Sequence, residues 1–426
     1  MIILDRALEQ RAAEGNPVRV AIVGAGYMAR GIAAHAGMMS GIQLVGISNR
    51  TVGRAERLLE ELGHGSPDKA TTAAEMEAAV ARGRPVVATD AFALCGADGV
   101  DVIIETTGEV EFGARVTLEA IRNRKHVVLV NAELDATVGP LLKVKADEAG
   151  VVLTNTDGDE PGVTMNLLRY VRTIGMQPVL VGNIKGFIGP HRNPDTQQVF
   201  ADSVGQGPKM ITSFADGTKL SMEATIVANA AGLRVARRGM RGHRCAHVKD
   251  VLSLWSADEL LAGDGFVDYV LEAEPGSGAF VVGHCDRPIP QEYLKYFKMG
   301  DGPFYVFYTP WHLPQAEAPL TAARAALFHD ASVTPLGAPR CDVVTVAKRD
   351  LRAGEVLDGI GGFMCYGTIE SADGARRERL LPMGLSEGCE LLEDVAIDQP
   401  IGYEHVQLPG GRLIDGLRRE QDTLFA

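Results

Sequence analysis

A glycine-rich turn directly after an apolar strand is the feature that most constrains the fold of this chain. Residues 18–23 (VRVAIV) run into Gly24-Ala-Gly26-Tyr-Met-Ala29. Gly24 permits a tight turn, Gly26 lets the backbone approach a pyrophosphate, and Ala29 lets the next helix pack on the strand. The N–H groups that open this helix then suit anionic oxygens. The pattern predicts a dinucleotide-binding turn with contacts from Gly24, Gly26, Tyr27, Met28 and Ala29.

The end of the next predicted strand, residues 43–48, indicates which dinucleotide binds. NAD-binding chains usually carry an acidic residue at this point, on the ribose 2′-hydroxyl. This chain has Asn49 and Arg50 there, with no carboxylate in reach. Because a guanidinium suits a 2′-phosphate, we predict that Asn49 and Arg50 contact NADP(H). The alternative is that Arg50 only opens an exposed helix.

The first 160 residues alternate between apolar strands and helices. Strands are predicted at 18–23, 43–48, 85–89, 100–104, 126–130 and 151–154, and Thr72-x-x-Glu75 predicts a capping box. Val- and Ile-rich runs of this kind suit a parallel sheet covered on both faces. We predict an α/β protein: a doubly wound parallel Rossmann sheet (1–160), an α+β catalytic domain (161–338) and a small β-rich C-terminal domain (339–426). Residues 315–330 are expected to pack back on the first domain.

Polar side chains follow three of the predicted strands. Ligands of parallel sheets bind at the carboxyl ends of the strands, so we expect these side chains to line one crevice. The clusters are Thr106, Thr107 and Gly108 after the fourth strand, Asn131 and Glu133 after the fifth, and residues 157–160 after the sixth.

The last of these clusters contains three carboxylates, Asp157, Asp159 and Glu160. Like charges this close are costly unless a cation or an ammonium group neutralises them. Oxygen ligands suit Mg²⁺ or Mn²⁺. We predict that Asp157 and Asp159 bind a divalent cation and that Glu160 is catalytic. The alternative is an acidic helix N-terminus with Pro161 in its first turn.

Two lysines are further candidates for catalysis. Lys185 ends a predicted strand beside a glycine, where its ammonium can reach a phosphate or a reacting oxygen, although an exposed lysine is equally compatible. Lys219 and Glu223 lie four residues apart on a largely apolar predicted helix and share one face. An ion pair on such a helix favours a pocket-lining role over a surface pair. We predict catalytic roles for Lys185, Lys219 and Glu223, and a second role for Glu223 as a metal ligand.

Arginines 238, 241 and 244 lie in the one basic block of the chain. They either gather a substrate phosphate or form a solvated charged loop.

Composition excludes several classes of protein. The chain has 426 residues, enough for two or three domains, and its net charge of −13 argues against nucleic acid as a partner. No stretch approaches the ~20 apolar residues of a membrane span, and the N-terminus does not read as a signal peptide. The six cysteines lack metal-site spacing and indicate reduced thiols. We expect a cytoplasmic protein with no nucleic-acid or membrane partner.

The glycine turn, Glu105-Thr-Thr-Gly108 and Asn131-Ala-Glu133, in this order, resemble the N-terminal domain of homoserine dehydrogenases over roughly residues 17–160. In that family the equivalents of Thr106–Gly108 and Asn131 lie along the nicotinamide. The chain departs from the family at Ala132, where a lysine is usual. Residues 347–357 resemble part of a SAF module.

Over its full length the chain resembles the reductoisomerase-like family that converts 1-deoxy-D-xylulose 5-phosphate (DXP) to 2-C-methyl-D-erythritol 4-phosphate. The resemblance implies isoprenoid precursor synthesis, NADPH, a divalent cation and a small phosphorylated sugar as substrate, and we expect a homodimer. Two alternatives remain open. One is a homoserine dehydrogenase-like oxidoreductase acting on another small polar carbonyl compound, and the other is a nucleotide-sensing protein without catalytic turnover.

Overall fold

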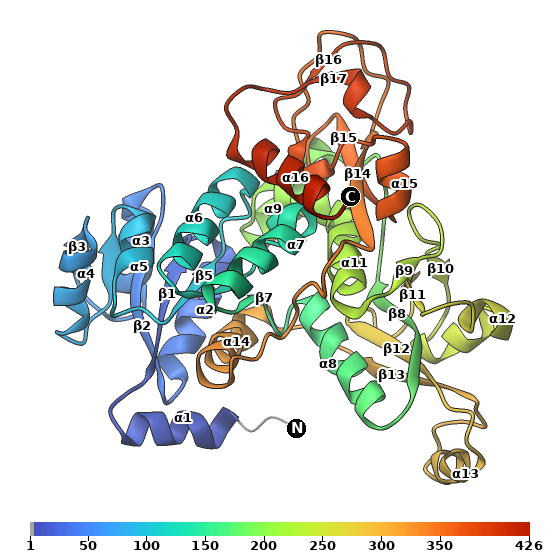
Figure 1. The fold of residues 1–426 in the computed structure, drawn as a ribbon, viewed down its shortest axis with the longest axis horizontal. Helices are drawn as coiled ribbons and strands as arrows, with labels where there is room; N and C mark the ends of the chain where they lie inside the picture. The colour runs from blue at the N-terminus through green and yellow to red at the C-terminus, as the bar shows by residue number, and fades with distance from the viewer. Residues whose placement is uncertain (1–3) are drawn as a thin grey trace. The chain divides into compact units, whose positions relative to one another are not determined.

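The computed structural model describes residues 4–426, and the chain groups into two compact units (Figure 1). The first unit comprises residues up to Asp159, Leu313–Gly337 and Arg412–Ala426. The second unit comprises Glu160–His312 and Ala338–Gly411. Neither unit is one continuous stretch of chain.

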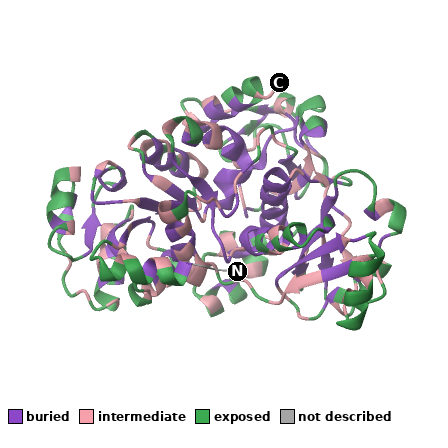
Figure 2. Cartoon of the chain, turned by 60° about the horizontal axis from the view of Figure 1, so that its bottom comes forward, coloured by how far each residue is buried: buried purple, intermediate pink, exposed green. Residues whose placement is uncertain are grey.

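The first unit is built on a seven-stranded sheet of order β3-β4-β2-β1-β5-β6-β7, in which every pair is parallel. Nearly every side chain of these strands is buried because helices cover both faces, as the purple strands of Figure 2 show. This confirms the predicted doubly wound Rossmann-like fold. The strands are β1 (Val18–Val23), β2 (Ile42–Ser48), β3 (Lys69–Ala70), β4 (Val86–Ala88), β5 (Val102–Glu105), β6 (His126–Leu129) and β7 (Leu153–Asn155).

Helices from three separate parts of the chain complete this unit. Helix α14 (Pro314–Phe328) packs against α2 (Tyr27–Met38) and the central strands, and α16 (Leu413–Leu424) packs against α6 (Val110–Arg122) and α7 (Ala132–Ala149). Thr72 and Glu75 form the predicted capping box at the start of α4. The other helices are α1 (Leu4–Ala13), α3 (Val52–Glu61), α4 (Ala73–Val80) and α5 (Ala91–Gly96).

The second unit contains a six-stranded mixed sheet. Its main path is β10-β11-β8-β12-β13, β9 pairs with β11, and β12 runs antiparallel to both β8 and β13. The strands are β8 (Gln177–Lys185), β9 (Arg234–Val235), β10 (His243–Arg244), β11 (Phe266–Leu271), β12 (Ala279–His284) and β13 (Phe304–Thr309).

Helix α11 (Thr218–Ala231) is the buried centre of this unit, because every one of its residues is buried. It packs against α8 (Glu160–Thr173) and β11, and α8 packs on β8 and β12. The remaining helices are α9 (Pro194–Val204), α10 (Pro208–Ala215), the 3-10 helix η1 (Val248–Ser253), α12 (Ala257–Leu260) and α13 (Pro288–Tyr296).

Residues 338–411 add two short antiparallel strand pairs to the second unit. β14 (Cys341–Ala347) pairs with β15 (Cys365–Ser371), β16 (Glu390–Leu391) pairs with β17 (Val406–Gln407), and the first pair packs on α11. A buried ion pair between Lys348 and Asp216, at 2.9 Å, ties this segment to the start of α11. Short helices α15 (Ala372–Arg377), η2 (Met383–Leu385) and η3 (Tyr403–His405) complete it.

No helix within residues 4–426 combines the length and the apolar character needed to cross a membrane.

Candidate functional site

The glycine turn after β1 has the backbone that a dinucleotide requires. Gly24 adopts φ +121°, and a Cβ there would lie 2.2 Å from the Oγ1 atom of Thr106. Thr106 Oγ1 itself donates to the carbonyl of Val23 at 2.9 Å. Only glycine therefore fits at position 24, which explains the first glycine of the motif.

Gly26 leaves the start of α2 open. It is the N-cap residue of that helix, no side chain caps the first turn, and a Cβ at Gly26 would meet no atom within 4 Å. Ala29 is fully buried, Met28 is half-buried and Tyr27 is exposed. The helix start can thus receive a pyrophosphate, and the residues of the turn fit a dinucleotide.

Asn49 and Arg50 differ in their surroundings. Asn49 Oδ1 accepts from the N–H of Ala25 at 3.2 Å, and its Nδ2 donates to the carbonyl of Thr51 at 2.9 Å, so this side chain braces the glycine turn. Arg50 is exposed and forms no ion pair with any residue in the described part of the chain. Its guanidinium is available to an anionic ligand.

The polar residues after β5 and β6 form hydrogen bonds within the loop after β5 and at the start of α7. The N–H of Thr107 donates to Glu105 Oε1 at 2.8 Å, and Gly108 has φ +69°. Asn131 caps α7 by accepting from the N–H of Leu134 at 3.0 Å and donates to the carbonyl of Glu109 at 3.1 Å. Glu133 is buried in the first turn of α7. Cofactor contacts of Thr106, Thr107, Gly108, Asn131 and Glu133 stay a prediction.

Glu105 is a buried acid that sequence reasoning did not single out. Burial raises its pKa to about 7, although the hydrogen bond from Thr107 and the neighbouring Asn131 side chain oppose the increase. By hydrogen-bond geometry, its Oε2 atom has no partner. The one sequence signal for this burial is the position of Glu105 at the end of an otherwise apolar strand.

The second unit brings together three of the four predicted catalytic residues. Lys185, at the end of β8, donates to Glu160 at the start of α8, and its Nζ lies 3.5 Å from Glu223 Oε2 on α11. Both carboxylates are only 3% exposed, while the lysine side chain is 19% exposed. Asn183, two residues before Lys185 on the same strand, also donates to Glu160.

The electrostatics of this cluster keep Glu160 ionised. Burial alone would raise the pKa of Glu160, but the Lys185 ammonium, a hydrogen bond with Glu223 and the nearby His312 together lower it to about 2. His312 Nδ1 lies 3.8 Å from Glu160 Oε1 and is partly exposed. Glu223 is thus a second buried acidic side chain beside the Lys185 ammonium.

Sequence reasoning missed Asn183 and His312. The alternation along β8 places Asn183 on the same side of the strand as Lys185, and this spacing was the available signal. His312 follows no recognisable motif. Lys219 is buried on α11 one turn before Glu223, as predicted from the helical spacing, and its predicted catalytic role is untested.

The predicted divalent-cation site is not supported. Asp157 Oδ2 pairs with Arg324 Nη1 at 2.8 Å and also accepts from Ser332, so a guanidinium supplies the neutralising charge. Glu223 has Lys185 as its neighbour. Among residues 4–426, no three His, Cys, Asp or Glu side chains form a group that could hold a metal ion. Asp159 is therefore not part of such a group either.

The basic block of residues 237–244 is paired with acids. Arg238 contacts Glu370 at 2.7 Å, Arg241 contacts Glu259 at 2.5 Å, and Arg244 contacts Glu272. These arginines therefore brace the surface of the second unit, in line with the charged-loop alternative.

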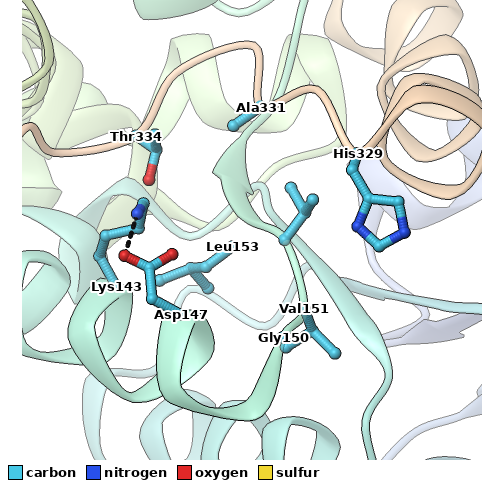
Figure 3. A pocket seen from close by; sticks show the side chains of 9 residues that line it. Lys143, Asp147, Gly150, Val151, Leu153, His329, Ala331 and Thr334 are labelled. Atoms are coloured by element: carbon cyan, nitrogen blue, oxygen red, sulfur yellow. Dashed lines mark hydrogen bonds and ion pairs between the residues drawn. The ribbon is translucent and has the colours of Figure 1, made fainter.

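A pocket of about 400 Å³ in the first unit lies at the wrong edge of the sheet for a cofactor (Figure 3). It is lined by Gly150–Leu153, where β7 begins, and by the ion pair of Lys143 with Asp147. Ligands of parallel sheets bind where strands end, so we do not assign the active site to this pocket.

Two family models match parts of the sequence. Residues 158–318 match the model described as oxidoreductase DRL, catalytic domain, and residues 7–90 match shikimate / quinate 5-dehydrogenase. Each match covers less than half of the chain. The first includes Glu160, Lys185, Glu223 and His312, so the clustered side chains lie within a stretch similar to an oxidoreductase catalytic domain.

Solved structures share the general fold at low similarity. A myo-inositol dehydrogenase from Lactobacillus casei, in complex with NAD(H) and myo-inositol, is 12% identical over 63% of this chain and 72% of that chain, with a TM-score of 0.37. A biliverdin reductase from Synechocystis, in complex with biliverdin and NADP⁺, is 15% identical over 71% of this chain and 83% of that chain, with a TM-score of 0.37. We base no functional argument on these similarities. A search of curated proteins finds no match.

The family matches correct the sequence-based assignment. They describe an oxidoreductase and a dehydrogenase, and they do not support the assignment to the DXP reductoisomerase-like family, with its reaction and its isoprenoid pathway. The predicted SAF module also lacks support, because neither match extends beyond residue 318. The matches support the coarser conclusion that the protein is an oxidoreductase.

Proposed function

We propose that this protein is an NADP(H)-dependent oxidoreductase that interconverts a carbonyl group and an alcohol on a small polar substrate. The observation that carries the proposal is the partly exposed Lys185 ammonium, held by the buried carboxylates of Glu160 and Glu223. The match of this segment to an oxidoreductase catalytic domain supports it. The open start of α2 at Gly26 and the unpaired Arg50 support the cofactor.

The residues of the first unit would hold the cofactor by its phosphates. Gly24 and Gly26 admit the pyrophosphate to the start of α2, and Arg50 pairs with the 2′-phosphate. When bound, a nicotinamide dinucleotide supplies the hydride for reduction.

Lys185 is the proton donor in this proposal. Its ammonium donates a proton to the substrate oxygen as the carbonyl is reduced. Glu160, which is ionised, orients the ammonium together with Asn183 and stabilises its charge. In this proposal a proton on Glu223, whose Oε2 atom lies 3.5 Å from Lys185 Nζ, restores the ammonium after transfer and is itself replaced from solvent.

The alternative of a nucleotide-sensing protein without turnover is less compatible with this cluster. Burying two carboxylates beside one ammonium is expensive, and a sensor would have no need of the arrangement. Such perturbed ionisable groups gather at catalytic sites more often than elsewhere.

The test combines cofactor titration with a turnover assay. We expect NADPH to bind more tightly than NADH by fluorescence titration. We also expect NADPH oxidation with at least one member of a panel of small polar aldehydes and ketones that includes aspartate semialdehyde. Lys185→Ala should lower kcat by about 100-fold or more while leaving NADPH binding intact. Lys295→Ala, at an exposed lysine, is the matched control. NADPH binding without oxidation of any compound would favour the sensor, and undiminished turnover by Lys185→Ala would remove the lysine from the mechanism.

A further inference from the structure

An unpaired strand edge in the second unit is free of charged residues. β13 is the last strand in the main path of its sheet and pairs only with β12. Its sequence, FYVFYT, has high strand propensity and contains no charge, proline or lysine that would block pairing with another chain. Natural proteins usually protect such an edge, so this one has the properties of an interface.

The register identifies which backbone groups face outward. Cys285 donates its N–H to the carbonyl of Pro303 at 2.9 Å, so positions 285 and 303 form a hydrogen-bonded pair. Because hydrogen-bonded and non-hydrogen-bonded pairs alternate in an antiparallel ladder, Phe304, Val306 and Tyr308 direct their N–H and C=O groups away from β12.

Helix α13 lies in the connection that leads into this edge strand, and it carries an exposed apolar stripe. None of its residues is buried. Ile289, Tyr293, Tyr296 and Phe297 are 63–77% exposed and recur at positions i, i+4, i+7 and i+8, which puts them on one helical face. An isolated apolar residue on a surface is ordinary, but a stripe of four indicates a contact surface.

We propose that a second copy of this chain pairs with β13 in antiparallel orientation, across a two-fold axis at Val306. This pairing sets Phe304 opposite Tyr308 of the other copy, and Val306 opposite Val306, in pairs of the aromatic and β-branched type that stabilise sheets. The two mixed sheets then form one continuous sheet. The homodimer expected from the sequence thereby acquires a defined interface.

The uncharged edge allows a second copy to approach despite the net charge of the chain. Each chain carries a net charge of −13, so two copies repel unless they meet through an uncharged surface. β13 has no charged residue, and self-pairing therefore opposes no acids. An anionic membrane would be repelled by the same net charge.

The two-fold geometry also gives the α13 stripe a contact. Antiparallel pairing sets the beginning of β13, where α13 connects, beside the end of β13 in the other copy. Trp311, 56% exposed, follows that end. The stripe and the tryptophan then meet reciprocally, as a two-fold interface requires.

The test measures the mass of the full chain in solution by light scattering during size-exclusion chromatography. We expect about twice the monomer mass of 45.4 kDa for the wild type. Val306→Pro removes an outward N–H that β12 does not use, and Tyr293→Glu with Phe297→Glu places charges on the exposed stripe. Each variant should raise the dissociation constant at least tenfold. The matched control is Val199→Glu with Phe200→Glu, at exposed apolar residues of α9.

Several outcomes would overturn the proposal. They are a monomeric wild type, dimers that survive both interface variants, or equal dissociation of the α9 control. Circular dichroism checks the fold of Val306→Pro, and if that variant is unfolded the α13 variant decides alone. A monomer that sediments with phosphatidylcholine–phosphatidylserine vesicles would assign the stripe to a membrane instead. NADPH titration of each variant keeps this result separate from the proposed function.

Discussion

Replacing Glu105 by glutamine should stabilise the protein at alkaline pH and leave its stability nearly unchanged at acidic pH. Glu105 is fully buried, its Oε2 atom has no hydrogen-bond partner, and its pKa rises from 4.5 to about 7 on folding. Well below pH 4.5 both the folded and the unfolded state carry the proton, so ionisation makes no contribution to stability. Between pH 4.5 and 7 only the folded state keeps it, so stability falls as pH rises, by about 1.4 kcal/mol per pH unit.

Above pH 7 the loss is complete at about 3 kcal/mol. Glutamine resembles the protonated acid and keeps Oε1 as the acceptor for Thr107, so Glu105→Gln removes this loss. Urea unfolding at pH 5 and pH 8.5 measures the difference. We expect a gain of about 3 kcal/mol at pH 8.5 and below about 1 kcal/mol at pH 5. Glu109→Gln, at an exposed neighbour, is the control. An equal gain at both pH values would refute the reasoning, since it would not come from ionisation.

Three further predictions concern the cofactor, the catalytic cluster and the core. Arg50→Asp should weaken NADPH binding about tenfold or more and improve NADH binding, because a carboxylate accepts from the 2′-hydroxyl and repels a 2′-phosphate; unchanged affinities in fluorescence titrations would exclude Arg50 from the site. Lys185→Ala should lower kcat by about 100-fold or more with NADPH affinity retained, as steady-state kinetics and titration will show. Lys348→Met should lower the free energy of unfolding by about 3–5 kcal/mol in urea, because Asp216 would be buried without its ammonium partner. The double variant Lys348→Met, Asp216→Leu should regain stability, since it buries no unpaired charge; no gain over Lys348→Met would contradict this explanation.

The parallel sheet could be predicted from sequence because its signals are local. Continuous apolar runs, a glycine turn and a capping box each depend on a few neighbouring residues, and the six strands other than β3 overlap their predicted ranges. β3 consists of Lys69–Ala70 alone and is too short to leave a pattern. The packing of α16 in the first unit could not be predicted from sequence either. It depends on contacts such as the hydrogen bond that Gln421 accepts from the N–H of Leu141, 280 residues away in the sequence. Nothing in either segment by itself indicates this contact.

The acidic residues after β7 show that local sequence can predict that buried carboxylates require a neutralising cation, but cannot identify that cation. Three carboxylates in four residues require neutralisation, and this inference holds: Asp157 is buried beside Arg324, and Glu160 is buried beside Lys185. The neutralising groups come from 167 and 25 residues away, a guanidinium on α14 and an ammonium on β8. A divalent cation seemed required only because neither partner is adjacent in sequence. Each carboxylate is neutralised by its own protein cation, so that Asp157 belongs to the core of the first unit and Glu160 to the proposed catalytic cluster of the second. Arg324 and Lys185 are similarly exposed, at 17% and 19%, but the second carboxylate beside Lys185 is buried whereas Asp330 beside Arg324 is 43% exposed. Our proposal therefore assigns proton transfer to Lys185.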